Sequence, residues 1–248
     1  MKVAAYQAPL LPEGSMHALD LIREQVARCE EEGIAILCSP EAVLGGLADF
    51  SADPVPFAIR TGGGQLASVL APLASSKVTS IVGFTELAPD GAIYNAAAVF
   101  YDGRVEGVYR KIHPAIRRSA YAPGWETPVF RAGRLTFGIL LCNDSNFPDL
   151  ARRMAAADAT ALFIPTNNGL PNGRASLQLN AAARTTDIAR ATENRVWVIR
   201  ADVAGRNGYL ASPGCSEIVN PEGVVVQGAR LEDWDLLVAD IDVDRRGK

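Results

Sequence analysis

Apolar and polar positions alternate between two periods along the chain, one typical of helices and one typical of strands. Residues 18–32 place apolar side chains at helical spacing, and Gly33 follows where such a helix would end. Between the helical segments lie apolar runs of strand length. The predicted helices are residues 18–33, 63–77, 149–159 and 177–194, and the predicted single strands are residues 2–8, 34–42, 79–87, 159–167, 196–205 and 236–243.

Further segments show the pattern of β-hairpins, with turn residues between two alternating arms. These are residues 95–111 with a turn at Asp102-Gly103, residues 127–142 with a turn at Ala132-Gly133, and residues 215–228 with a turn at residues 221–223. Helices and strands in alternation, combined with hairpins, indicate an α/β sandwich with mixed sheets. No linker, repeat or low-complexity tract divides the chain, so we expect residues 1–248 to form a single domain.

Some of these apolar runs end at a side chain with reactive chemistry. Glu41, Lys111 and Cys142 each stand at or just past the end of a predicted strand. Ligands of α/β proteins collect at strand ends, so these three side chains can meet in one crevice. Glu41 is a suitable base for a cysteine nucleophile, and Lys111 can lower the thiol pKa and stabilise an oxyanion. The backbone N–H of Asn143, directly after the cysteine, is a second candidate oxyanion donor.

Each of these residues also has a plain structural interpretation. A lone cysteine at the end of an apolar strand is more often a packed core residue than a nucleophile. Glu41 after Pro40 can cap a helix, and Lys111 beside Arg110 can be a solvated charge at the end of a hairpin. Residue spacing alone leaves both interpretations open.

Composition and charge exclude several classes of function. Charged residues make up 21% of the chain, the net charge is −4, and no basic block is present, which argues against nucleic-acid binding. The apolar runs are too short to span a bilayer, and the first residues lack a signal-peptide pattern. The four cysteines form no CxxC pair and there are only two histidines, so no metal site is expected. We therefore expect a cytoplasmic protein that binds neither membrane nor metal.

Several blocks of the sequence, in order along the chain, resemble the nitrilase superfamily of carbon–nitrogen hydrolases. No single block is specific, but their order and their spread over nearly the whole chain are. The blocks are KVAAYQAPL (2–10), CSPEAVLGG (38–46), GFTE (83–86) with IYNAAAVFYDGRVEGVYRKIHP (93–114), FGILLCNDSNFPDLAR (137–152), RATENRVWVIRADVAG (190–205) and GCSEIVNPEGVVV (214–226).

This resemblance implies a four-layer αββα sandwich and a catalytic triad of Glu41, Lys111 and Cys142. In such enzymes the cysteine attacks an amide, nitrile or carbamoyl carbon, an amine or ammonia leaves, and water hydrolyses the thioester. The resemblance implies no cofactor. It also places Thr166 and Asn167 near the nucleophile, as candidates for substrate contact. Homodimers in this superfamily commonly form through helices near the nucleophile, here residues 149–159 and 179–192.

The chain departs from the superfamily pattern between the lysine and the nucleophile. Many members carry a second glutamate shortly before a Pro-Gly pair, but the corresponding stretch here is HPAIRRSAYAPG (113–124). Arg117 or a neighbour occupies the position expected for that acid, and Glu126 lies beyond the Pro-Gly. If the second acid positions the lysine or the substrate, then the substrate class or the turnover differs here.

Two further departures concern the walls of the expected pocket. Leu47 stands where many members have an aromatic residue. Cys-Asn-Asp at the nucleophile differs from the Cys-Trp-Glu of true nitrilases and is closer to amidases and carbamoylases. The arginines that follow Cys-Asn-Asp in D-carbamoylases are replaced by Ser145 and Asn146. Arg117 or Arg118 is an alternative contact for a substrate carboxylate, although solvated loop arginines are an equally good interpretation.

The leading functional hypothesis is therefore a hydrolase of small linear amides. An N-carbamoyl amide hydrolase is the alternative within the same chemistry, and a binding or scaffold protein of low activity is the alternative of another class. The retained residues Glu41, Lys111 and Cys142 argue against the scaffold. Structural roles are expected for the remaining polar and thiol side chains that the motifs contain, namely Tyr94, Asn95, Asp144, Arg190, Glu193, Asn194, Cys29, Cys38 and Cys215.

Overall fold

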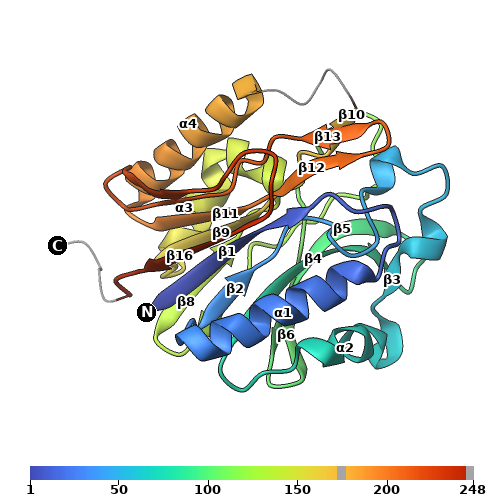
Figure 1. Ribbon diagram of the computed structural model, residues 1–248, viewed down its shortest axis with the longest axis horizontal. Helices are drawn as coiled ribbons and strands as arrows, with labels where there is room; N and C mark the ends of the chain where they lie inside the picture. Colours follow the sequence, from blue (N-terminus) through green and yellow to red (C-terminus); the bar gives the residue numbers. More distant parts are fainter. Residues whose placement is uncertain (172–176, 244–248) are drawn as a thin grey trace.

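A computed structural model describes residues 1–171 and 177–243 of the chain (Figure 1). The strands of this described part form two mixed sheets. The larger sheet has the order β10 (Leu170–Pro171), β13 (Leu210–Ser212), β12 (Val203–Asn207), β1 (Lys2–Pro9), β2 (Ile36–Cys38), β4 (Thr79–Leu87), β5 (Ile93–Tyr101) and β6 (Arg104–Arg110), with β16 (Asp235–Asp240) paired to β1 and β3 (Ile59–Arg60) paired to β4. The smaller sheet has the order β15 (Val225–Gly228), β14 (Glu217–Val219), β11 (Trp197–Ala201), β9 (Ala161–Pro165), β8 (Leu135–Ile139) and β7 (Val129–Ala132).

Helices cover the outer faces of both sheets. Helices α1 (His17–Glu32) and α2 (Gln65–Leu70) lie on one side of the sandwich, and α3 (Pro148–Ala156) and α4 (Leu177–Asn194) lie on the opposite side (Figure 1). The 3₁₀ helices are η1 (Ala48–Phe50), η2 (Val55–Phe57), η3 (Gly62–Gly64), η4 (Ala71–Leu73) and η5 (Cys142–Asn146). The architecture is the four-layer αββα sandwich that the sequence predicts.

Strand β1 shows why the larger sheet is buried on both faces. Its odd positions, Val3 and Ala5, pack in the core between the two sheets, whereas Ala4 and Tyr6 pack in the core beneath α1 and α2. Successive side chains of a strand point to opposite faces, so a continuous apolar run is what a doubly covered strand requires. In the β1 sequence KVAAYQAP the buried positions are therefore consecutive, whereas a strand exposed on one face would alternate buried and exposed residues.

The structure corrects two sequence predictions. Residues 196–205 do not form one strand, because the chain passes from β11 in the smaller sheet to β12 in the larger sheet at Asp202. The Asp202 carboxylate accepts hydrogen bonds from the backbone N–H groups of Val203 and Asn168, which holds the chain in the crossing. The helix predicted at residues 63–77 is also shorter. It ends at Leu70 and continues as η4, since Pro72 lacks the N–H that a longer α-helix requires.

Close backbone packing brings the ends of several strands together at one edge of the sandwich. A Cβ atom on Gly83 of β4 would lie 2.2 Å from the carbonyl oxygen of Pro40 and 2.7 Å from the Cα of Glu41. Glycine at this position therefore allows the segment after β2 to pack directly on β4. Strand β5 pairs antiparallel with β6, so that Lys111, just past the end of β6, lies beside Asn95.

Candidate active site

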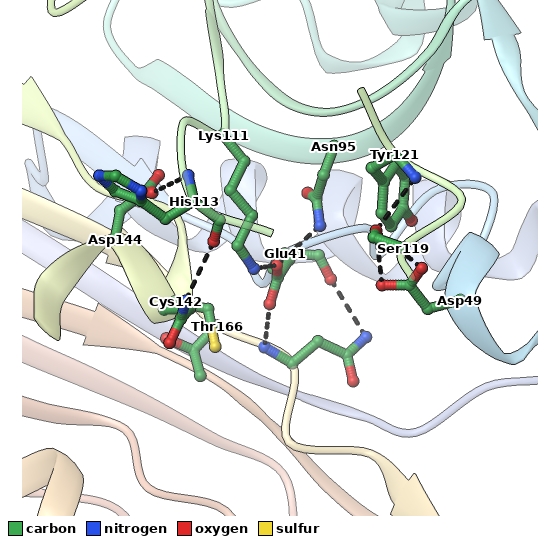
Figure 2. A network of polar contacts seen from close by, with 12 residues as sticks. Glu41, Asp49, Asn95, Lys111, His113, Ser119, Tyr121, Cys142, Asp144 and Thr166 are labelled. Carbon is green, nitrogen blue, oxygen red and sulfur yellow. Dashed lines mark hydrogen bonds and ion pairs between the residues drawn. The ribbon is translucent and has the colours of Figure 1, made fainter. Parts of the chain in front are cut away.

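Glu41 lies three residues past the end of β2 and is almost completely buried, with 1% of its surface exposed. Its Oε1 accepts hydrogen bonds from the Lys111 ammonium at 2.5 Å and from Asn95 Nδ2 at 2.7 Å (Figure 2). Its Oε2 accepts one from the backbone N–H of Asn167 at 3.0 Å. Donors from three different segments therefore fix the carboxylate, which is a stronger restraint than a helix cap provides.

Lys111 directly follows β6 and is 4% exposed. Its backbone N–H donates to the Asn95 carbonyl at 2.8 Å, and its own carbonyl accepts from Gly124 N at 2.7 Å. Burial by itself lowers the pKa of the Lys111 ammonium, but the negative charge of Glu41 and its hydrogen bond to the ammonium help to outweigh burial, so the pKa is raised. The ammonium is thus kept charged in a buried site, next to the candidate base.

Cys142 begins η5 just after β8 and has a positive φ of 47°. A left-handed conformation is uncommon for a non-glycine residue and is typical of functional sites. Burial and then the nearby Glu41 carboxylate raise the pKa of the Cys142 thiol, Lys111 and Arg200 lower it, and the pKa that results is about 12. The thiol is therefore protonated at neutral pH and needs a base before it can attack.

These three side chains line one cavity of about 330 Å³. The structure thus brings together the residues that the sequence placed at three strand ends. Asn143 and Asn167, two further sequence candidates, also line this cavity. Its apolar wall consists of Leu47, Phe50, Ala115, Ile116, Leu170, Leu179, Ala182 and Ala183. The arrangement offers a nucleophile, a base and a cation around a space that accepts a small molecule.

The carbon–nitrogen hydrolase family model matches residues 2–248. The chain belongs to the carbon–nitrogen hydrolase family. Among its relatives, the hydrolase in the pqqF 5′ region of Pseudomonas protegens is 28% identical over 100% of this chain and 85% of its own length. The (R)-stereoselective amidase of a Pseudomonas species is 29% identical over 73% of this chain and 69% of its own. The N-carbamoylputrescine amidase of Solanum tuberosum is 30% identical over 63% of this chain, but this covers only 57% of that protein.

Solved structures of the nitrilase superfamily share the fold of this carbon–nitrogen hydrolase. Saccharomyces cerevisiae Nit3, a member of branch 10, matches with a TM-score of 0.84 at 23% identity, over 96% of this chain and 89% of its own. A Nesterenkonia amidase matches with a TM-score of 0.79 at 26% identity, over 99% of this chain and 93% of its own. In another structure of that amidase, with a TM-score of 0.78, acrylamide has added to the active-site cysteine.

Asp144 connects the nucleophile segment of the hydrolase to the lysine segment. Its fully buried carboxylate accepts hydrogen bonds from the Tyr109 hydroxyl at 2.7 Å, from His113 N at 2.8 Å and from Ile112 N at 3.3 Å. Burial raises the pKa of this carboxyl, and the hydrogen bond from Tyr109 is the largest opposing effect. These bonds run to the segment around Lys111 and not to the backbone around Cys142, so Asp144 fixes Cys142 and Lys111 relative to each other.

Arg200 is a site residue that the sequence reasoning missed. It lies in β11, lines the cavity, and is 2% exposed. Its Nε and Nη2 donate to both oxygens of Asp187, at 2.6 and 2.5 Å. Its Nη1 donates to Thr166 Oγ1 at 2.7 Å and its Nη2 to Ser145 Oγ at 3.3 Å. The sequence signal for Arg200 was a single charged residue inside the apolar run VWVIRA. Its partner Asp187 lies on the separate helix α4, so the pair could not be inferred from the run itself.

The remaining candidates differ in position. Thr166 is fully buried and bonded to Arg200 and to the carbonyl of Ile164, and it is not among the residues that line the cavity. Asn95, expected to be structural, donates directly to Glu41. Arg117 and Arg118 are exposed, and the cavity wall takes Ala115 and Ile116 from their loop instead.

The other cysteines lie apart from the Glu41–Lys111 pair. Cys29 and Cys38 are buried in the two cores, as expected. Cys215 is half-buried and donates its thiol proton to Asp202, at a sulfur–oxygen distance of 3.1 Å, and burial raises its pKa well above the usual range. Within the described residues, no cluster of three or more His, Cys, Asp or Glu side chains could hold a metal ion. None of the helices in that part of the chain is long and apolar enough to cross a membrane.

Proposed function

We propose that this carbon–nitrogen hydrolase cleaves small linear amides through a thioester on Cys142, with Glu41 as general base and acid and Lys111 as electrostatic catalyst. The observation that carries the proposal is the buried Glu41–Lys111 pair, which faces the same cavity as a cysteine at the start of η5. Amidases among the relatives and the structural neighbours support the substrate class.

The first half-reaction forms the thioester. Glu41 takes the Cys142 thiol proton while sulfur bonds to the carbonyl carbon, and the carbonyl π pair moves to oxygen. Lys111 stabilises this oxyanion together with the backbone N–H of Asn143, which has no acceptor within the first turn of η5. Glu41 then gives the proton to the nitrogen, the C–N bond breaks, and ammonia or an amine leaves.

The second half-reaction releases the acid. Glu41 takes a proton from a water molecule, whose oxygen attacks the thioester carbon. The second tetrahedral intermediate uses the same oxyanion donors. When it collapses, the C–S bond breaks and the sulfur of Cys142 recovers the proton from Glu41. The products are a carboxylic acid and the amine, and Cys142 returns to its thiol form.

An N-carbamoyl amine is the second candidate substrate class, in which the attacked carbon lies between two nitrogens. The N-carbamoylputrescine amidases among the relatives favour it. The cationic side chains in the cavity lining are Lys111 and Arg200, which are paired with Glu41 and Asp187. Neither is free to clamp a substrate carboxylate, so N-carbamoyl amino acids fit the described lining poorly.

Ammonia release from a broad panel of amides, carbamoyl amines and nitriles tests the proposal. We expect the wild type to release ammonia and the Cys142→Ala variant to fall to background, by about 10⁴-fold or more. Cys215→Ala is the matched control, because Cys215 is also half-buried and is not among the lining residues. After a brief substrate pulse, mass spectrometry should find the acyl adduct on Cys142. Equal release by wild type and Cys142→Ala across the panel would overturn the proposal.

A further inference from the structure

Asp49 places a third carboxylate in the cavity lining. It lies in η1, after the Gly45-Gly46 pair, and is half-buried between the lining residues Leu47 and Phe50. It appears beside Ser119 and Tyr121 on the same side of Glu41 as Asn95 in Figure 2. The mechanism above gives this carboxylate no role.

The donors that hold Asp49 are neutral. The Ser119 hydroxyl lies 2.8 Å from Oδ1 and 3.1 Å from Oδ2, and the backbone N–H of Ala120 donates to Oδ1 at 2.7 Å. Ser119 in turn accepts from the backbone N–H of Tyr121 at 3.0 Å. These bonds orient the carboxylate but do not neutralise it.

The other charges of the lining are balanced in pairs. Glu41 pairs with Lys111, and Arg200 pairs with Asp187, which is not among the lining residues. Among the residues that the structure describes, none forms an ion pair with Asp49. Asp49 is therefore the carboxylate of the described lining that has no ion-pair partner, and an unpaired carboxylate in a partly enclosed site attracts cations.

The loop that donates hydrogen bonds to Asp49, residues 113–124, is one in which the sequence departs from the superfamily pattern. The second acid expected near Arg117 is absent, and the same loop instead offers Ser119 and Ala120 as donors to a carboxylate from another segment. Asp49 makes no hydrogen bond to Lys111, whose ammonium is bonded to Glu41. Asp49 is therefore placed to contact a ligand and not to position the lysine.

We propose that Asp49 binds a cationic group at the end of the substrate remote from the scissile bond, so that the preferred substrates are linear ω-amino amides or ω-amino carbamoyl compounds. This inference rests on the proposed function and narrows its substrate class. Leu47, Phe50 and Ile116 provide an apolar wall suited to the methylene chain between the ammonium and the amide. The amide end then faces Cys142 and the ammonium faces Asp49.

Matched substrate pairs test this assignment in the whole protein. Each ω-amino amide from 3-aminopropanamide to 6-aminohexanamide is compared with its neutral isostere, in which a methyl group replaces the ammonium, as in 4-aminobutanamide and pentanamide. We expect the wild type to prefer the cation in kcat/KM by about tenfold or more at the best chain length. In Asp49→Asn, which retains an acceptor for Ser119 and Ala120, this ratio should fall towards one.

The matched control is Asp53→Asn, because Asp53 is exposed on the chain just beyond η1 and is not among the lining residues. It removes an equal charge from the same region and should leave the ratio unchanged. High salt should weaken the wild-type preference. An equal cation preference in wild type and Asp49→Asn, or no preference at any chain length, would overturn the inference.

A second readout does not depend on turnover. Cys142 is modified with 2-aminoethyl methanethiosulfonate and with its neutral counterpart, propyl methanethiosulfonate, and the rate is followed at Cys142 by mass spectrometry. The thiolate attacks the reagent sulfur, a mixed disulfide forms, and methanesulfinate leaves. The ratio of the two rates should be higher in wild type than in Asp49→Asn, and equal ratios would contradict the role of Asp49. If the protein shows no Cys142-dependent ammonia release, the proposed hydrolase function fails. The modification rates at Cys142 can still be measured, so the role of Asp49 is tested separately.

Discussion

The inner and outer parts of the cavity are built differently. In the inner part, Glu41 and Lys111 are almost fully buried, and their polar atoms are bonded to residues from β5 and from the chain after β9. In the outer part, Asp49, Ile116 and Asn146 lie on 3₁₀ or irregular segments and are half-buried or exposed. Asn146 bonds mainly to its neighbour Asn143.

This difference separates chemistry from selectivity. Several independent elements fix the inner geometry, so a change in any one of them disturbs the reacting atoms. The outer wall rests on loop contacts, such as the bonds from Ser119 and Ala120 to Asp49, and loops tolerate substitution. Two of the departures from the superfamily pattern, at Leu47 and in residues 113–124, fall on this outer wall. Substrate preference can therefore change while the inner cluster stays the same.

The strongest way to test the inner part is Glu41→Gln. Loss of the proposed general base should lower kcat/KM for amides by about 10²–10⁴-fold. The same change removes a charge that raises the Cys142 pKa, while Lys111 and Arg200 continue to lower it. The pKa should therefore fall from about 12, and Cys142 should react faster with iodoacetamide between pH 7 and 9.

Protection of the buried thiols of Cys29 and Cys38 from iodoacetamide in the same preparation distinguishes this mechanism from simple unfolding. A folded variant that hydrolyses amides as fast as the wild type would contradict the role of Glu41 as base. Asp53→Asn serves again as the control for loss of a single negative charge, since Asp53 is exposed. It should alter neither rate appreciably.

Lys111→Met tests how strongly the buried charges depend on each other. The substitution leaves Glu41 buried without its cation, which costs about 3–5 kcal/mol of the free energy of unfolding. Urea denaturation followed by circular dichroism measures this loss. The exposed Arg28–Glu32 pair is the comparison, because Arg28→Met should cost at most about 1 kcal/mol. Similar losses of unfolding free energy in Lys111→Met and Arg28→Met would show that the buried Glu41–Lys111 pair stabilises the fold no more than an exposed pair does.

Tyr109→Phe tests the connection between the nucleophile and lysine segments. It removes the hydroxyl bonded to Asp144 and should cost about 1–3 kcal/mol. The Tyr109 bond lowers the Asp144 pKa, which burial raises, so the variant raises this pKa further. The loss of stability should then grow as the pH rises through the wild-type Asp144 pKa, because the bond stabilises the ionised form. Unfolding measured at intervals from pH 4 to pH 8 checks this, and a loss of stability that shrinks as the pH rises would contradict it.

Features that depend on local residue pattern or on the order of motifs were predictable from the sequence. The helix at residues 177–194 has the predicted bounds, and the hairpins at residues 95–111 and 215–228 turn where predicted. The hairpin at residues 127–142 turns at Gly133-Arg134, one residue later than predicted, because Ala132 still belongs to β7. Glu41, Lys111 and Cys142, which line one cavity, could be selected from the sequence because each follows an apolar strand and matches a motif. Strands β3, β10 and β13 escaped prediction, since two or three residues carry no periodicity.

Contacts between distant segments were not predictable in the same way. Asp187 and Arg200 come from a helix and a strand, and neither residue type indicates its partner. The division of residues 196–205 at Asp202 depends on donors from Asn168 and Cys215, which only the folded chain brings close. Asp49 is similar, because Ser119 is 70 residues away along the chain. Such pairings follow from topology and not from periodicity.

The smallest effects are expected at Arg117 and Arg118, which the sequence offered as contacts for a substrate carboxylate. Both are exposed and are not among the lining residues, so Arg117→Gln and Arg118→Gln should each change the free energy of unfolding by no more than about 0.5 kcal/mol. KM for a carboxylated substrate such as N-carbamoyl-β-alanine should also stay within about twofold, because neither guanidinium reaches the cavity. A rise in KM for this substrate alone, with neutral amides unaffected, would assign the outer wall a second charged contact and weaken the preference for cations that Asp49 implies.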